Sequence, residues 1–139
     1  MPSNHRIQSF VETVTSGDFV GAIERFYTPG ASMRENMAPP RVGRDGLVAW
    51  ERGVMGAFKS IEAELVAPPA VAGDHVAVLW RFRFAPAEGP ERVLEEIAWQ
   101  RWEGDFIAEE QFFYDPAQIA ARALEQAGGI EPPTFSLGS

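Results

Sequence analysis

The sequence predicts an α+β fold in which helices come first and a sheet follows. Up to about residue 58, apolar residues recur at helical spacing, as Ile7, Phe10 and Val14 do. From residue 61 onward the apolar pattern alternates, and β-branched and aromatic residues are frequent. Helices grouped at one end of a chain and strands at the other indicate helices packed against a single sheet.

Three helices are expected in the first part of the chain. The first ends at Ser16-Gly17, and Asp18 caps the second. The second ends at Pro29-Gly30, and the third begins after Gly43. Helical spacing places these residues on the inward faces: Ile7, Phe10, Val11, Val14, Phe19, Ile23, Phe26, Tyr27, Leu47, Trp50 and Val54.

Strands are expected on both sides of the third helix. Before it, Met33, Glu35 and Met37 stand at alternate positions of one strand and therefore share a face. Pro39-Pro40 ends that strand. After the helix, turn-forming residues separate four further strands, which form a meander. These strands cover residues 61–66, 76–84, 93–102 and 106–114.

The length favours a single domain, because 139 residues are enough for one hydrophobic core and few for two. Asp115 and Pro116 are typical of the cap and first position of a helix, and Gly128-Gly129 marks its end. We therefore expect one domain over residues 1–127 and a mobile C-terminal tail over residues 128–139.

Composition and charge argue against several classes of function. The net charge of −8 and the scattered arginines disfavour nucleic acid as a partner. No apolar run is long enough to cross a membrane, and the first residues lack the pattern of a secretory signal. The absence of cysteine excludes disulfides and thiolate metal sites. We expect a cytoplasmic protein without a cofactor and without a nucleic-acid or membrane partner.

Three segments resemble the nuclear-transport-factor-2-like superfamily, above all its ketosteroid-isomerase and SnoaL-like polyketide-cyclase branches. They are SGDFVGAIERFYTPGASMRE at 16–35, RVGRDGLVAW at 41–50 and RWEGDFIAEEQFFYDP at 101–116. The resemblance covers about residues 7–115. It implies one SnoaL-like domain with a cystatin-like fold, in which a cone-shaped, curved mixed β-sheet wraps around three N-terminal helices and encloses a pocket.

Strand parity and the resemblance together separate an inner from an outer sheet face. The inner face is expected to hold Met33, Glu35, Met37, Val78, Trp80, Phe82, Phe84, Glu96, Ala98, Gln100, Glu110, Phe112 and Tyr114. The outer face is expected to hold Leu79, Ile97, Trp99 and Phe113. Because such a row of large apolar groups is costly to leave in water, we predict a homodimer through the outer face.

Glu35 occupies, by the resemblance, the place of the carboxylate that moves protons in ketosteroid isomerases. An apolar setting suits this role, because desolvation raises a carboxyl pKa toward working pH. The donors of a steroid isomerase oxyanion hole are missing, however, since Phe10 and Ala98 stand at the matching positions. Tyr114 and a protonated Glu110 or Glu96 are the groups that could replace them.

Other chemistries of the superfamily fit less well. An epoxide hydrolase of this fold uses an arginine between two carboxylates, whereas Trp80, Ala98 and Gln100 occupy the central inward positions. SnoaL-like cyclases use an aspartate that Phe112 replaces here. Glu96 and Glu110 have a structural alternative, in which they lie solvated at the rim or pair with an arginine. A site in which carboxylates bind a metal ion is also possible, although no motif indicates one.

The sequence thus predicts a pocket for a small hydrophobic molecule. Its hypothetical function is that of an acid–base isomerase, cyclase or hydrolase that uses Glu35. The alternative is a non-catalytic ligand-binding or dimerisation module. The expected catalytic residues are Glu35, Glu110 and Tyr114. The expected ligand contacts are Met33, Met37, Trp50, Trp80, Phe82, Glu96, Gln100 and Phe112, and no metal ligands are expected.

Overall fold

The computed structural model describes residues 1–118. The predicted end of the terminal helix, the domain boundary at residue 127 and the predicted tail lie outside these residues. The helices are α1 (Asn4–Thr15), α2 (Phe19–Phe26) and α3 (Arg44–Gly56). The strands are β1 (Tyr27–Glu35), β2 (Arg41–Val42), β3 (Ser60–Leu65), β4 (Ala70–Ala72), β5 (His75–Ala85), β6 (Arg92–Glu103) and β7 (Phe106–Phe113). None of the helices within residues 1–118 is long and apolar enough to cross a membrane.

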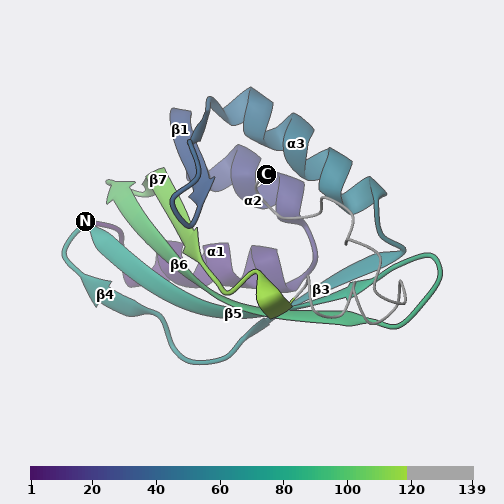
Figure 1. The fold of residues 1–139 in the computed structure, drawn as a ribbon. Coiled ribbons are helices and arrows are strands. Elements are labelled where there is room, and N and C mark those ends of the chain that lie inside the picture. Colours follow the sequence, from purple (N-terminus) through teal and green to yellow (C-terminus); the bar gives the residue numbers. More distant parts are fainter. Residues whose placement is uncertain (119–139) are drawn as a thin grey trace.

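The strands form one curved mixed sheet in the order β2-β1-β7-β6-β5-β3, with β4 paired to β5. β1 runs parallel to β7, and the other pairs are antiparallel. Figure 1 shows the three helices within the concave side of this sheet, with β1 and β7 rising along one side of α2. The predicted α+β fold, with a sheet wrapped around three helices, is confirmed.

Alternating burial along the central strands gives the sheet a packed inner face. Val76, Val78, Trp80 and Phe84 on β5 are at most 2% exposed, as the predicted parity requires. The helices place their apolar stripes on this face. Phe10 of α1 is central, because its ring packs edge-on against Phe26, Tyr27 and Trp102 at centroid distances of 5.5, 6.2 and 6.1 Å. This cluster packs α1 and α2 against the sheet.

Two predicted boundaries were wrong. The second helix ends at Phe26 rather than at Pro29-Gly30, and Tyr27 already has extended backbone angles. A register shift between Tyr27 and Ser32 lets β1 continue through the proline, which lacks an N–H for the ladder. β1 then ends at Glu35, where Asn36 turns with a positive φ of 48°. β2 and β4 were not predicted, since strands this short leave no periodic pattern.

The start of α2 depends on one side chain, and we expect Asp18→Ala to destabilise the protein. An Asp18 carboxylate oxygen accepts a hydrogen bond of 2.9 Å from the Gly21 N–H, which caps the helix. Loss of such a cap costs about 1 kcal/mol of the free energy of unfolding, measurable by urea denaturation. Asp18→Asn keeps the acceptor and should lose less than half as much. Equal losses in both variants would contradict the capping role.

Candidate functional site

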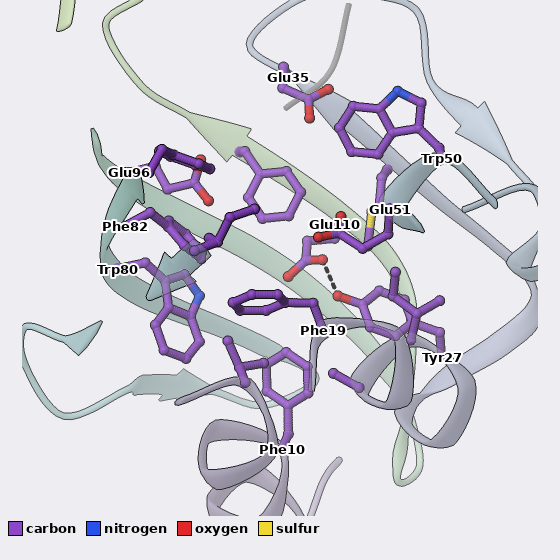
Figure 2. Close-up of a pocket in the computed structure, with 17 residues that line it drawn as sticks. Phe10, Phe19, Tyr27, Glu35, Trp50, Glu51, Trp80, Phe82, Glu96 and Glu110 are labelled. Carbon is purple, nitrogen blue, oxygen red and sulfur yellow. Dashed lines mark hydrogen bonds between the residues drawn. The ribbon is translucent and has the colours of Figure 1, made fainter. Parts of the chain in front are cut away.

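A cavity of about 80 Å³ lies between the helices and the inner face of the sheet. This volume holds several water molecules or a small organic ligand. Figure 2 shows aromatic rings on several sides of the cavity and carboxyl groups between them. The residues that line it are Phe10, Val14, Phe19, Ala22, Ile23, Tyr27, Met33, Glu35, Trp50, Glu51, Ile61, Trp80, Phe82, Phe84, Glu96, Glu110 and Phe112.

Glu35 at the end of β1 is held by an arginine from β2. One terminal nitrogen of Arg41 donates to both carboxylate oxygens of Glu35, at 3.1 and 3.0 Å. The Arg41 guanidinium also lies 4.0 Å from the centre of the Trp50 ring, in a cation–π contact. Burial raises the pKa of Glu35 above its usual value, and the charge and hydrogen bonds of Arg41 oppose this shift.

Glu110 on β7 belongs to a buried chain of hydrogen bonds. Its carboxyl group accepts one hydrogen bond from the Tyr27 hydroxyl and another, of 2.7 Å, from the Gln100 amide. The Trp102 indole N–H donates to the Gln100 carbonyl oxygen at 3.0 Å and fixes that amide. Burial raises the pKa of Glu110 to about 7, although the hydrogen bonds from Tyr27 and Gln100 lower this pKa.

Glu96 on β6 is buried without a partner. It is 2% exposed, and neither carboxyl oxygen has a hydrogen-bond partner in the described structure. Figure 2 shows the carboxyl group turned toward the interior of the cavity. Burial raises the pKa of Glu96 well above its usual value, and the nearby carboxylates of Glu110, Glu35 and Glu51 raise it further. The surroundings of this carboxyl group therefore favour its protonated form.

Two polar residues of the cavity were missed by the sequence analysis. Tyr27 was read as part of an apolar helix stripe, although its hydroxyl group needed a partner once buried. Glu51 follows Leu47 by one helical repeat on α3 and thus points to the same side, a spacing that could have identified it. Burial raises the pKa of Glu51 to about 7.

Most of the predicted site residues lie together, and three do not. Gln100 is buried behind Glu110 and contacts that carboxyl group rather than the cavity. Met37 is 75% exposed, because the strand ends at Glu35 and the chain turns away. Tyr114 follows β7 and packs against the cluster of Phe84 and Leu94. The expected inward positions of Met37 and Tyr114 at the cavity were therefore wrong.

The structural alternative for Glu96 and Glu110 was wrong as well. The two side chains are 2% and 3% exposed, so neither is solvated at a rim. Arg41 of β2 pairs with Glu35 instead. Within residues 1–118, no group of three or more histidine, aspartate and glutamate side chains is arranged to hold a metal ion.

The arrangement combines carboxyl groups in different states within one apolar space. Arg41 favours the anionic form of Glu35, whereas Glu96 has no hydrogen-bonding partner among residues 1–118, and its burial favours the neutral form. An anionic and a neutral carboxyl group in one apolar cavity can act as base and acid. The geometry thus permits proton transfer on a bound small molecule.

The sequence matches a family model. The model for the SnoaL-like domain covers residues 7–110, which is more than half of the chain. A search of curated proteins finds no match.

Three similar solved structures can be compared with the fold. A protein assigned as a SnoaL-like polyketide cyclase from Mesorhizobium loti is 23% identical, with a TM-score of 0.67 over 79% of this chain and 97% of that chain. A protein with a ketosteroid isomerase-like fold from Catenulispora acidiphila, in complex with trimethylamine, is 15% identical, with a TM-score of 0.72 over 86% and 92%. TerC, co-crystallised with polyporic acid, is 12% identical, with a TM-score of 0.69 over 81% and 91%. At these identities the likeness shows the fold alone.

Glu96→Gln should stabilise the protein increasingly as the pH rises. Below the ordinary pKa of 4.5 the carboxyl group is neutral in both the folded and the unfolded state. Above it the unfolded state ionises while the buried group keeps its proton, so the wild type loses stability and the amide variant does not. Between pH 4 and pH 7, the free energy of unfolding of Glu96→Gln should rise by about 1 to 3 kcal/mol relative to that of the wild type, as measured by urea denaturation.

The matched control is Glu95→Gln, because Glu95 is the preceding residue on the exposed face and pairs with Arg81. Its free energy of unfolding should change by less than about 0.5 kcal/mol, with little pH dependence. A difference between Glu96→Gln and the wild type that stays constant with pH would contradict the neutral state of Glu96.

Proposed function

Because the chain belongs to the SnoaL-like domain family, we propose that its cavity binds a small hydrophobic molecule and that buried carboxyl groups move a proton on it. The observation that carries this proposal is the contrast, in the same apolar space, between Glu35, which is paired with Arg41, and Glu96, which has no hydrogen-bond partner within residues 1–118. The reaction class is an isomerisation, cyclisation or hydrolysis that proceeds by acid–base catalysis.

In the proposed reaction, Glu35 is the base. Arg41 keeps its carboxylate charged and oriented, while burial keeps it more basic than a carboxylate in water. Glu35 removes a proton from a carbon next to a carbonyl group, or from a water molecule. Glu96 acts as the acid and gives its proton, or a hydrogen bond, to the oxygen on which negative charge develops. It thereby supplies the donor that Phe10 and Ala98 cannot provide.

Small organic molecules in similar structures support a binding role for the cavity. One of the similar proteins is in complex with trimethylamine, and another was co-crystallised with polyporic acid. In the non-catalytic alternative, the cavity binds a small molecule but catalyses no reaction on it. It is favoured by the fact that Arg41 contacts both oxygens of Glu35, which leaves the carboxylate less free to accept a proton.

The outer face of the sheet supports the proposed homodimer. Leu79, Ile97 and Phe113 are neighbours across three strands, and Ile97 and Phe113 are 46% and 38% exposed. Trp99 is 43% exposed and stacks on His75. Ion pairs flank this apolar row, including Arg101 with Glu109. An apolar centre with a charged rim is typical of a subunit interface.

The base is tested by deuterium exchange on a panel of small ketones in D2O, followed by NMR. If Glu35 is the base, the protein accelerates exchange at the carbon next to the carbonyl, and Glu35→Gln lowers the rate by about a hundredfold. Ligand affinity should stay within a few-fold. Glu62→Gln, on the exposed side of β3, is the control and should keep the rate. Equal rates for the wild type and Glu35→Gln on every ketone that binds would favour the non-catalytic alternative.

The dimer is tested by sedimentation velocity at micromolar concentration. Trp99→Ala removes the largest exposed ring of the outer face and should raise the dimer dissociation constant at least tenfold. The control is Met37→Ala. Met37 is 75% exposed and lies outside the apolar row of the outer face, so this variant should leave the dimer dissociation constant unchanged. A wild-type protein that sediments as a monomer would contradict the dimer.

A further inference from the structure

The cavity has an excess of negative over positive groups. Four glutamates line it, namely Glu35, Glu51, Glu96 and Glu110, and no lysine, arginine or histidine of the described chain does so. Arg41, which reaches Glu35 from β2, compensates one of these groups. An anionic ligand would therefore meet unfavourable charge in a space with mainly apolar walls, where electrostatic interactions are stronger than in bulk water.

Glu96 lacks the partner that a buried carboxyl group requires. Gln100 and Tyr27 already bond to Glu110, and Arg41 to Glu35, so these donors are committed elsewhere. The carboxyl group of Glu96 is turned toward the cavity, and because the side chain is 2% exposed its two oxygens have almost no contact with solvent. A ligand atom that carries positive charge would satisfy them by a charge-assisted contact.

The walls around Glu96 also suit a cation. Figure 2 shows the rings of Trp80, Phe82 and Phe19 in the same part of the cavity as the Glu96 carboxyl group. The faces of aromatic rings carry negative potential and attract organic cations, while the edges and alkyl neighbours accommodate apolar substituents. Carboxylate and aromatic rings together favour an ammonium group with small alkyl substituents over an inorganic ion.

We propose that the cavity selects a small organic cation, an alkylated amine or a quaternary ammonium compound, with Glu96 as the counter-charge. This proposal rests only on the binding part of the proposed function and names the chemical class of the ligand, because a Glu96 that is ionised beside a bound cation cannot also act as the acid. The cavity volume of about 80 Å³ limits the charged part to a group the size of a few methyl substituents around one nitrogen.

Binding of such a cation should be coupled to release of a proton. In the free protein the protonated form of Glu96 is favoured, first by its burial and then by the nearby carboxyl groups of Glu110 on β7, Glu35 on β1 and Glu51 on α3, with Arg41 engaged by Glu35. A permanent positive charge beside Glu96 stabilises the carboxylate, so the proton leaves as the ligand enters. Affinity therefore rises as the pH rises toward the value at which free Glu96 ionises.

The experiment compares tetramethylammonium chloride with tert-butanol, a neutral molecule of similar size, at constant ionic strength and at pH 5.5 and 8. Isothermal titration calorimetry in two buffers of different ionisation enthalpy counts the protons released. We expect tetramethylammonium to bind at least tenfold more tightly at pH 8 than at pH 5.5, and more tightly than tert-butanol, with proton release. Tert-butanol should show no pH dependence.

Glu96→Gln is the decisive variant, with Glu95→Gln as its matched control. The first should lose at least tenfold in affinity for tetramethylammonium and all proton release, and should keep the affinity for tert-butanol within twofold. The control should behave as the wild type does. Near-ultraviolet circular dichroism checks that both variants keep the native packing of their tryptophans.

Two results would overturn the proposal in different ways. If tert-butanol or a small ketone binds and tetramethylammonium does not, the preference for cations is wrong and the proposed function stands. If neither tetramethylammonium, tert-butanol nor any ketone of the panel binds at millimolar concentration, the binding function and the ligand class are both wrong. Binding of tetramethylammonium that Glu96→Gln leaves unchanged would overturn the role of Glu96.

Discussion

The burial of carboxyl groups inside an apolar cone is the constraint on which the rest of the site depends. Glu35, Glu96 and Glu110 are 4%, 2% and 3% exposed, and each ionised group would cost several kcal/mol without compensation. The fold compensates two of them, through Arg41 for Glu35 and through Tyr27 and Gln100 for Glu110. β2 is only two residues long, but it positions Arg41, which pairs with Glu35.

Because side chains alternate along β5 and β6, one face of the sheet borders the cavity and the other carries ion pairs at the surface. Glu96 faces the cavity, while Glu95 on the outer face pairs with Arg81, which also pairs with Glu64. Adjacent residues of one type thus occupy opposite environments, since a step of one residue changes the face. The parallel pairing of β1 with β7 aligns Met33 with Glu110 and brings the two ends of the fold to one cavity.

The fold and the inward positions of the central strands could be predicted because both depend on periodicity. Alternation over β5 and β6 extends for many residues, so the side that Trp80 and Glu96 face was identifiable. The positions of Met37 and Tyr114 were wrong because parity holds only while a strand continues, and a single turn residue such as Asn36 ends it. The pairing of Glu35 with Arg41 depends on the conformation of the turn between β1 and β2, for which the sequence has no comparable signal.

Glu96, which has no hydrogen-bond partner within residues 1–118, is unfavourable for the stability of the protein but suited to contact with a ligand. A buried carboxyl group that keeps its proton lowers the stability of the native state at neutral pH, and an apolar or amide side chain would avoid this cost. Its neighbour in the ladder, Trp80, is packed and nearly inaccessible, so the local backbone and core do not need an acid at this position. Local choices that conflict with stability are frequent at functional sites. The departure lies on the cavity side of β6, and this supports the role proposed for Glu96 beside that proposed for Glu35.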